Sequence, residues 1–508
     1  EKQLLVSKED RKKNFEKAQR DYAEVNFSLG QTYYEQGKYK DAINAYQIAA
    51  DLRPADSRTL SALANALEVT GNSARAEELL KKALAIDEKE MGATNPDLVN
   101  RVWELGAYYA NHNNFEQCEL HFKRVITILE KNFGTDYPAI AFHLNNLAML
   151  YMTKARNVDA ELLIKRALAI QEKAYGPESP KIAYTLNTLG AFYSSQGKTA
   201  DAEEVLKRSL NIISKFVQTS TDKEAKASEL AVNYVTAAGY LAEIYRDQGK
   251  YAEAEKYLTT RAELEEKSLG PMHPRLVSSL NALAYIYEQQ KKYPDAQRIY
   301  ERCLAIMENA LGSESPQLAS AIYNLVELHE EQKNYALAEA GFKRVISIYE
   351  KAGSKASAVA RGLINLADFY RRQEKYDEAE SQYNRSLALM ENSGEPAYPI
   401  VPAILTKLAL SFSRQKKFDE AEKMFVRALD TIDKAQNPTF NDVVAAVSNL
   451  SRFYWNQKKY SQAELLMRRL VSALESHKES GNRNVAVATL QLASVTREQN
   501  KYAEAKTL

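Results

Sequence analysis

The stretch "LNNLAMLYMTKARNVDAELLIKRALAI", from Leu144 to Ile170, decides how this chain folds. Forty-two residues later the chain reads "LNTLGAFYSSQGKTADAEEVLKRSLNI", and forty-two residues earlier it reads "VWELGAYYANHNNFEQCELHFKRVITI". A line that returns at a fixed period is typical of a repeat architecture, in which each unit is one small supersecondary structure. We therefore expect an array of similar units and not one large globular core.

Two positions trace the repeat along almost the whole chain of 508 residues. The first is a leucine, which we call the aligned leucine. It recurs at Leu29, Leu63, Leu105, Leu147, Leu189, Leu241, Leu283, Leu325, Leu366, Leu408, Leu450 and Leu492. The second is a small residue thirteen positions later, at Ala42, Ala76, Cys118, Ala160, Ala202, Ala254, Ala296, Ala338, Ala379, Ala421, Ala463 and Ala505. Such regularity indicates a contact that admits no larger side chain.

Each repeat is predicted to hold two helices, which we name A and B. An aromatic residue usually follows the aligned leucine by four positions, and a large apolar residue follows the small position by four. These spacings place each set on one helical face. The small residue marks the crossing of A and B, where overpacking typically costs about 1–3 kcal/mol. Several B helices end in a G-x-x-x-P segment such as Gly176–Pro180, where glycine ends one helix and proline begins the next.

The spacing L-x-x-L-[GA]-x-x-Y…A-x-x-x-[FYL] resembles the tetratricopeptide repeat (TPR). The 42-residue period, with "LNNLA" and "QEKAYG" segments, resembles the kinesin light chain type of that repeat, most closely over Asn95–Ser214 and Ala237–Ser480. The first two repeats resemble ordinary 34-residue units. The resemblance implies an all-α fold, a right-handed α-solenoid of about twelve helix-turn-helix units. The long heptad segment by which kinesin light chains join their motor is absent, so we do not carry over the motor-adaptor role.

The repeats divide the chain into four parts, expected to form one continuous solenoid. Residues 1–22 are predicted to be an N-terminal capping helix, residues 23–213 repeats one to five, and residues 235–508 repeats six to twelve. Residues 214–234 hold an insertion, for which a loop, a lengthened helix pair and a change of superhelix pitch stay open. The chain stops inside helix B of the twelfth repeat, so we expect either more chain or a partner at that end.

In TPR solenoids helix A lines a concave groove, and the resemblance places candidate partner-binding residues there. With the aligned leucine counted as slot seven, asparagines occupy slot five at Asn145, Asn187 and Asn281, and slot six at Asn146, Asn324, Asn365 and Asn449. In kinesin light chains such asparagines hold the backbone of an extended peptide, and an amide offers the donor and the acceptor that a peptide unit needs. The alternative is that they lock helix A to the loop of the next repeat.

Aromatic and charged residues add to this predicted groove. The aromatic candidates are Trp103, Tyr285, Tyr323 and Trp455, which are either interface anchors or side chains half-packed between helices. Glu288, Glu327, Glu330 and Glu331 form an acidic zone, and Arg361, Arg371, Arg372, Arg414 and Arg452 form a basic zone, with Arg246 nearer the middle of the chain. Such a pattern could select a segment of opposite charge, or it could be a solvated surface.

The composition argues against several other classes of protein. Lys+Arg 68 against Asp+Glu 67 leaves a net charge of +1, which gives no global reason to bind nucleic acid or an anionic membrane. No apolar run is long enough to span a bilayer. Two cysteines, Cys118 and Cys303, are too few for a disulfide framework or a cysteine metal site, and the six histidines show no ligand spacing. We expect no cofactor, no metal and no enzymatic activity.

The leading interpretation is a non-catalytic scaffold that binds a partner protein or peptide in its groove. One alternative is an assembly subunit that organises a larger complex through its convex face and ends, with self-association open. Another is the regulatory or targeting arm of a larger protein. The chain does not begin with Met. For that reason an exported or organelle-lumen location stays open, although a soluble, cytoplasmic location is the default expectation.

Overall fold

The structure is a computed structural model that describes residues 2–220, 223–476 and 481–508. Within those residues it holds helices and no β-strand, which confirms the all-α prediction. In unit order the first α-helices are α1 (Lys2–Glu35), α2 (Tyr39–Leu52), α3 (Ser57–Val69), α4 (Ser73–Met91), α5 (Val99–Asn111), α6 (Phe115–Phe133), α7 (Ile140–Thr153), α8 (Asn157–Tyr175), α9 (Ala183–Ser195), α10 (Thr199–Thr219), α11 (Lys223–Asp247) and α12 (Tyr251–Leu269).

The remaining α-helices are α13 (Leu276–Gln289), α14 (Tyr293–Leu311), α15 (Ala319–Glu331), α16 (Tyr335–Lys351), α17 (Ala356–Arg372), α18 (Tyr376–Asn392), α19 (Ile400–Arg414), α20 (Phe418–Asp433), α21 (Phe440–Asn456), α22 (Tyr460–Ser476), α23 (Gly481–Glu498) and α24 (Tyr502–Thr507). Short 3₁₀ turns at Pro96–Leu98, Pro180–Ile182 and Pro316–Leu318 precede α5, α9 and α15. Each turn begins with the proline that the sequence placed at the start of a new helix A.

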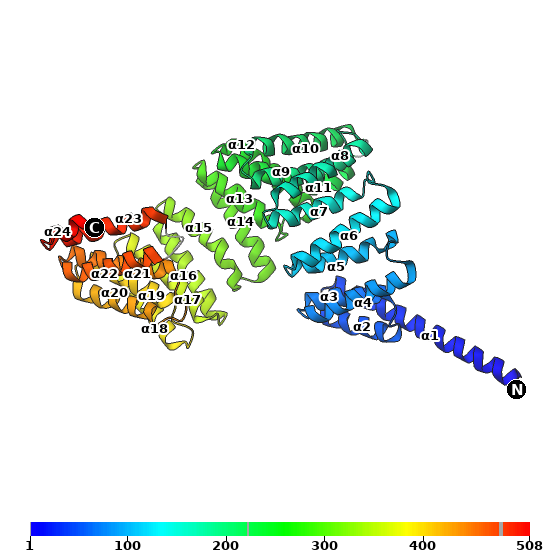
Figure 1. The fold of residues 1–508 in the computed structure, drawn as a ribbon, viewed down its shortest axis with the longest axis horizontal. Coiled ribbons are helices and arrows are strands. Elements are labelled where there is room, and N and C mark those ends of the chain that lie inside the picture. Colours follow the sequence, from blue (N-terminus) through cyan, green and yellow to red (C-terminus); the bar gives the residue numbers. More distant parts are fainter. Residues whose placement is uncertain (1, 221–222, 477–480) are drawn as a thin grey trace. The chain divides into compact units, whose positions relative to one another are not determined.

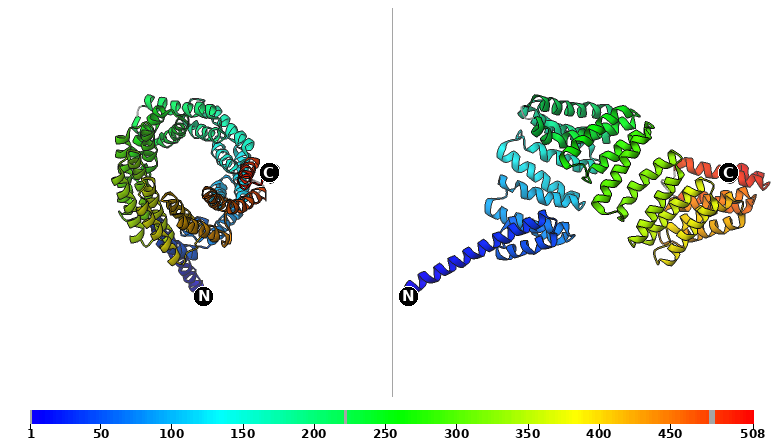
Figure 2. Two further views of the ribbon diagram at one scale, coloured as in Figure 1. Left: turned by 90° about the vertical axis from the view of Figure 1, so that its left-hand side faces the viewer. Right: turned by 180° about the vertical axis from the view of Figure 1, so that it is seen from behind.

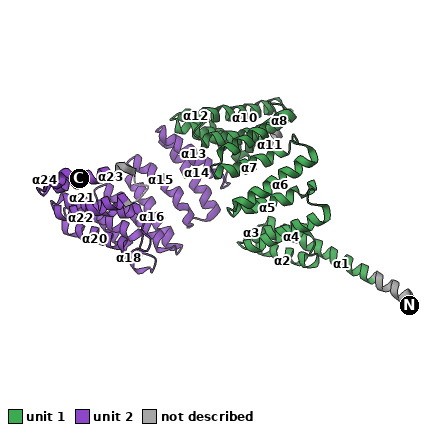
Figure 3. Cartoon of the chain, in the orientation of Figure 1, with its two compact units in different colours: residues 1–268 green, residues 269–508 purple. Residues whose placement is uncertain are grey.

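The chain divides into two compact units, Glu1–Ser268 and Leu269–Leu508 (Figure 3). In the part of unit 1 that the structure describes, α1 to α12 pair into six hairpins of helices A and B, and α13 to α24 pair likewise in unit 2 (Figure 1). Within each unit, helix B of one hairpin packs against helix A of the next. Each unit is therefore a stack of two-helix repeats, as the period predicts.

The small residues lie where helices A and B cross. The first eleven of them, from Ala42 to Ala463, are fully buried at 0% exposure. Ala505 is the exception and is half-buried, because α24 is only six residues long. Glycine can serve a similar purpose on helix A, since a Cβ atom on Gly190 would lie 2.5 Å from the side chain of Leu206. Close approach of the two helices thus requires a small side chain at both places.

The turn between helices A and B has the same backbone in every described hairpin. The residue eight positions after the aligned leucine has a positive φ each time. Four hairpins use glycine there, and the others use Asn113, Ala155, Lys291, Lys333, Glu374, Lys416, Lys458 and Asn500. A residue with a Cβ atom pays roughly 1–2 kcal/mol in this left-handed conformation. The turn geometry is therefore imposed by the packing of the hairpin and not by local preference.

Tyrosines of helix A join neighbouring hairpins through hydrogen bonds that the sequence analysis did not foresee. The aromatic residue four positions after the aligned leucine donates its hydroxyl to a glutamate of the preceding helix B. The pairs are Tyr109–Glu77 (2.9 Å), Tyr151–Glu119 (2.7 Å), Tyr245–Glu203 (2.8 Å) and Tyr370–Glu339 (2.9 Å). A lysine one turn after each glutamate approaches the same carboxylate. The aromatic residue that recurs at this position of the repeat thus forms a hydrogen bond between hairpins as well as part of the core.

A second joint, which we call the arginine clasp, links successive B helices. An arginine of one helix B pairs with an acid in the last turn of the preceding helix B. The pairs are Arg124–Glu88, Arg166–Glu130, Arg208–Glu172, Arg344–Glu308, Arg385–Glu350, Arg427–Glu391 and Arg469–Asp433. Arg208 also donates to the carbonyl of Pro177 at 2.8 Å, in the loop between the hairpins. The clasp therefore fixes the loop as well as the two helices.

Two of the expected segments, the N-terminal cap and the insertion, can be compared with the helices of unit 1. Residues 2–22 do not form a separate cap, because α1 runs unbroken from Lys2 to Glu35 and extends beyond the other helices of unit 1 (Figure 2). Residue 1 lies outside the described residues. In the insertion, α10 and α11 are longer than their counterparts, and residues 221–222 lie outside the described residues. Phe216 and Tyr234 from these extensions pack around Ile213 and Leu230.

Candidate partner-binding grooves

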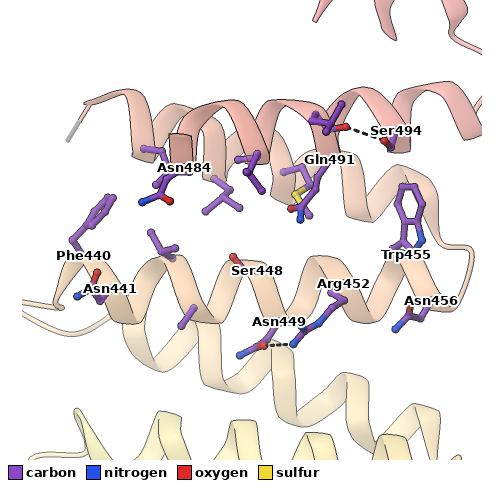
Figure 4. A pocket seen from close by; sticks show the side chains of 18 residues that line it. Phe440, Asn441, Ser448, Asn449, Arg452, Trp455, Asn456, Asn484, Gln491 and Ser494 are labelled. Atoms are coloured by element: carbon purple, nitrogen blue, oxygen red, sulfur yellow. Dashed lines mark hydrogen bonds between the residues drawn. The ribbon is translucent and has the colours of Figure 1, made fainter. Parts of the chain in front are cut away.

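The larger groove of unit 2 lies between α21 and α23, and we call it the C-terminal groove (Figure 4). Its volume is about 880 Å³. Met467, Leu470 and Leu474 of α22 line the groove, together with Val487 of α23. Because α21 and α23 are successive A helices, the groove is the space that they leave above the helix B between them. Because these groups are apolar, the groove is suited to binding apolar side chains of a ligand.

The polar side chains of the C-terminal groove are almost all uncharged. The amides are Asn441, Asn449 and Asn456 on α21 and Asn484 and Gln491 on α23, and Figure 4 shows the latter two facing α21. Arg452 is the single charged residue among the described lining residues, and its guanidinium donates to Asn449 Oδ1 at 2.9 Å. The groove therefore offers many donors and acceptors together with one positive charge.

Two aromatic residues stand on α21 at the two ends of the C-terminal groove (Figure 4). Trp455 is half-buried, and its ring meets that of Tyr460 edge to face, with 5.8 Å between centroids. Phe440 begins the helix and is also half-buried. Aromatic side chains that keep part of their surface free are the usual anchors of protein interfaces.

Unit 1 has a groove of the same construction, which we call the N-terminal groove. It lies between the A helices α5 and α7 above α6 and has a volume of about 550 Å³. Trp103, Phe142, Met149 and Tyr184 line it, and the last three come from α7 and α9. The Trp103 Nε1 atom is buried without a hydrogen-bond partner among the described residues. A donor left in that state costs free energy unless a ligand satisfies it.

The two grooves share a composition. Lys154 is the one charged residue among the described residues that line the N-terminal groove, as Arg452 is in the C-terminal groove. Asn146 takes the place of Asn449 and lies 3.5 Å from the Tyr184 hydroxyl, which donates to its Oδ1. Each unit thus presents a tryptophan, a slot-six asparagine and one cation over an apolar base.

The asparagines of slot five lie elsewhere than the sequence analysis expected. Asn145 is 0% exposed and donates through Nδ2 to Thr185 Oγ1 at 2.7 Å, in the next helix A. Asn187 is also buried and donates to the carbonyl of Asn233 at 2.8 Å. Asn281 is half-buried and accepts from Asn324 Nδ2 at 3.3 Å. These amides bond to the next helix A and not to a loop, and Asn145 and Asn187 are not on a groove surface.

The remaining candidates are spread over both units. Tyr285, Asn365, Arg246 and Arg414 are exposed, and Tyr323 is half-buried against Phe342. None of them lines either groove. The structure therefore brings together five of the residues named from sequence, in two groups. These are Trp103 with Asn146 in unit 1, and Asn449, Arg452 and Trp455 in unit 2, with Asn324 bonded to Asn281 apart from both.

The charged zones are partly neutralised by pairing. Arg372 binds Glu330 through two hydrogen bonds of 2.7 and 2.9 Å, which joins the basic zone to the acidic zone. Arg371 lies 3.6 Å from Asp368. Burial raises the pKa of Glu288, and the charges of Glu331 and Glu327 raise it further against a hydrogen bond from the Tyr300 hydroxyl.

Several groove residues were missed from sequence. Asn441, Asn456, Asn484 and Gln491 line the C-terminal groove beside the candidates that were named. A signal was present, because Asn441, Asn449 and Asn456 recur at spacings of eight and seven residues, which place them on one face of α21. Reading each repeat separately hides this face, since the slots of interest differ from repeat to repeat.

Nucleophiles and metal ligands are poorly represented among the described residues. Burial raises the pKa of the Cys118 thiol to about 11 and that of Cys303 to about 12. Burial also lowers the pKa of His143 to about 4. Within the described ranges no group of three or more metal-ligating side chains lies together, and no helix is long and apolar enough to cross a membrane. Thiols of such high pKa are fillers of the core and not reactive groups.

Stacked hairpins with a small residue at each crossing define an α-helical repeat protein, and grooves between successive A helices are its concave sites. Family models described as tetratricopeptide repeat match residues 139–215, 234–309, 277–351 and 358–434, which together cover more than half of the chain, and a second such model matches residues 27–90. The chain belongs to the tetratricopeptide repeat family, whose repeats generally mediate interactions between proteins.

Solved structures with related repeats are similar to parts of the chain. BtubC (BKLC) from P. vanneervenii is 20% identical, with a TM-score of 0.33 over 44% of this chain and 90% of its own. The nearly identical TPR-like repeats of a putative kinesin light chain from Podosopora anserina are 22% identical, with a TM-score of 0.32 over 42% and 98%. MamA is 18% identical, with a TM-score of 0.30 over 39% and 96%. No curated protein matches the sequence.

Proposed function

We propose that the chain is a non-catalytic scaffold that binds an extended segment of a partner protein in the N-terminal and C-terminal grooves. The observation that carries the proposal is the shared composition of the two grooves. Each combines an apolar base, a half-buried tryptophan, exposed amides and a single cation. A site of this kind suits a polypeptide, because apolar side chains can enter the base while amides bind the backbone.

The amide spacing supports an extended ligand. Asn441, Asn449 and Asn456 are eight and seven residues apart on α21, so they stand about 10–12 Å apart along the helix axis at about 1.5 Å per residue. An extended chain covers that distance in three to four residues, at about 3.3 Å each. Successive amides along the rim would therefore meet every third or fourth peptide unit of a strand that runs along α21.

Binding is favoured by pre-organisation. The groove side chains stand on helices whose hairpins are fixed by buried alanines, by tyrosine–glutamate hydrogen bonds and by arginine clasps. A rigid site leaves most of the ordering entropy to the ligand segment. Truncation of a central tryptophan in such an interface costs about 2 kcal/mol or more, which is roughly a thirtyfold loss of affinity.

A pull-down from native extract of the source organism, with quantitative mass spectrometry, tests the proposal. The tagged full chain is compared with Trp455→Ala/Gln491→Ala in the C-terminal groove and Trp103→Ala/Met149→Ala in the N-terminal groove. Leu465→Ala is the matched control, because Leu465 is exposed on α22 and does not line the groove. Thermal melting of each variant checks the fold.

We expect at least one partner to be retained by the wild-type chain and by Leu465→Ala, and to be lost by a groove variant that melts normally. If every protein enriched by the wild-type chain is enriched equally by both groove variants, the grooves do not bind the partner and the proposal is wrong.

A further inference from the structure

Helix α1 carries a stacking face that nothing in the described structure covers. In unit 1 the aligned leucines of the other hairpins, which are Leu63, Leu105, Leu147, Leu189 and Leu241, are 0–4% exposed, because the preceding hairpin packs on them. Their counterpart on α1, Leu29, is 41% exposed. One turn earlier, Val25 is 62% exposed, whereas its counterparts Thr59, Thr185 and Ala237 are 0–1% exposed and the other two, Arg101 and His143, are half-buried.

The polar part of the same face is also unmatched. In three later hairpins of unit 1, the tyrosine four positions after the aligned leucine donates to a glutamate of the preceding helix B, as Tyr109 does to Glu77 at 2.9 Å. Tyr33 holds this position on α1. Its ring lies 6.0 Å from the Lys38 ammonium, and its hydroxyl has no hydrogen-bond partner among the described residues. The face thus presents a phenol hydroxyl with no carboxylate opposite it.

The apolar ridge continues along the projecting part of α1, which Figures 1 and 2 show running out from unit 1. Phe15 is 69% exposed and Tyr22 is 56% exposed. With Val25 and Leu29 they follow spacings of seven, three and four residues, which form one stripe of a helix. From Phe15 to Tyr33 the stripe is about 27 Å long at about 1.5 Å per residue, which is five turns.

An adjacent side of α1 is already occupied, because Ala23, Asn26 and Gly30 are buried toward α2. The exposed stripe is therefore a second, separate surface of the same helix. In every other described hairpin of unit 1, the corresponding surface of helix A is covered by the preceding helix B. Those joints therefore show which side chains a helix needs in order to pack on this surface of α1.

We propose that α1 docks an amphipathic helix of a partner protein, which adds to the stack in the place of a preceding helix B. The partner helix is about five turns long, packs apolar side chains on Phe15, Tyr22, Val25 and Leu29, and accepts a hydrogen bond from Tyr33 with a carboxylate. A second copy of α1 does not meet this requirement, because its own stripe holds no acid. This surface is independent of the two grooves.

The probe for the test is a synthetic peptide of residues 73–91, the sequence of α4. In this chain α4 is the helix B that covers the face of α5, and it carries Glu77, the acceptor of Tyr109. Its composition favours a helix in isolation. The labelled peptide with blocked termini is titrated with the full chain, and binding is followed by fluorescence anisotropy.

Leu29→Asp places a charge in the ridge at an exposed position, so the fold is kept, and we expect at least a tenfold loss of affinity. Tyr33→Phe removes only the hydroxyl, and we expect a threefold to tenfold loss, equal to the loss caused by Glu77→Gln in the peptide. Combining the two changes should give no further loss. Leu162→Asp changes another exposed leucine, on α8, and is the control that should leave binding unchanged.

The proposal is overturned if the peptide does not bind, or if Leu29→Asp binds it as tightly as the wild-type chain does. It is also overturned if light scattering shows a dimer that Leu29→Asp dissociates, because the occupant would then be a second copy. Trp455→Ala serves as a further control. It lies in the C-terminal groove and should leave peptide binding unchanged, so failure of the groove proposal and failure of this one are distinguishable.

Discussion

Glu119 provides the sharpest test of how neighbouring hairpins are held together. Its carboxylate, on α6, accepts from the Tyr151 hydroxyl at 2.7 Å, from Arg156 at 3.1 Å and from Lys123 at 2.6 Å. Burial would raise the pKa of Glu119, but the hydrogen bonds from Lys123, Tyr151 and Arg156 lower it from 4.5 to about 2. The charged form is therefore bound more strongly in the folded chain than in the unfolded chain.

The magnitude follows from that pKa. A fall from 4.5 to about 2 corresponds to at most about 3.4 kcal/mol of stability at neutral pH, at 1.36 kcal/mol per pH unit. Glu119 is 16% exposed, but Lys123 and Arg156 are 56% and 39% exposed. Solvent screening of these partners lowers the expected loss in Glu119→Gln to about 2 kcal/mol.

Hydrogen exchange of the α6 and α7 amides is the suitable assay, because a repeat array opens locally and a single unfolding transition need not describe it. At pH 7 we expect roughly thirtyfold faster exchange in Glu119→Gln, which is 2 kcal/mol at 1.36 kcal/mol per tenfold change. The folded pKa is depressed, so this stability is complete above pH 4.5 and is lost as pH falls from 4.5 toward 2.

The difference between Glu119→Gln and the wild-type chain should therefore shrink at pH 3.5 relative to pH 7, after correction for intrinsic exchange rates. A difference below threefold at pH 7 would show that the joint contributes little. A difference that is the same at pH 7 and pH 3.5 would show that it does not depend on the charge of Glu119. Amides of α2, in the first hairpin, serve as the internal control and should exchange alike in both proteins.

Three further changes test the packing of the hairpins by urea unfolding. Ala160→Leu should destabilise the protein by about 1–3 kcal/mol, because Ala160 is fully buried where α7 and α8 cross, and an unchanged midpoint would contradict that placement. Gly190→Ala should cost a similar amount, since its Cβ would lie 2.5 Å from Leu206, and an unchanged midpoint would show that the Leu206 side chain moves away freely. Ala155→Gly should instead stabilise by about 1 kcal/mol, because Ala155 has φ of 55°, and a loss of stability would show that the turn is not strained.

Most of the fold follows from periodicity. The aligned leucines and the small residues mark both helices of each hairpin, and the structure places the first eleven small residues at buried crossings. The joints between hairpins could not be read in the same way. An arginine clasp needs an arginine and an acid from different repeats, and their proximity depends on how one hairpin tilts on the next. Arg166 and Glu130 look like ordinary surface charges until the helices are stacked.

The groove residues show that a repeat pattern does not predict which side of helix A each residue faces. Adjacent slots on helix A differ by about 100° around the helix axis, so an error of one slot moves a side chain from the surface to a joint. Asn145 and Asn146 are such neighbours, and the first is buried against Thr185 while the second lines the N-terminal groove. Which one faces outward is set by the next hairpin and not by the spacing within helix A.

The arginine clasps also bear on how such a chain can change its length. Both members of a clasp recur at the repeat period, so excision of residues 145–186, one whole period, would bring Arg208 opposite Glu130 in place of Glu172. Tyr193 would likewise meet Glu119. Loss or duplication of a complete period therefore recreates a joint of the native kind, whereas removal of a few residues within a helix misaligns the contacts of that helix with its neighbours. The joints between hairpins therefore tolerate a change of length by whole periods better than a change by part of a period.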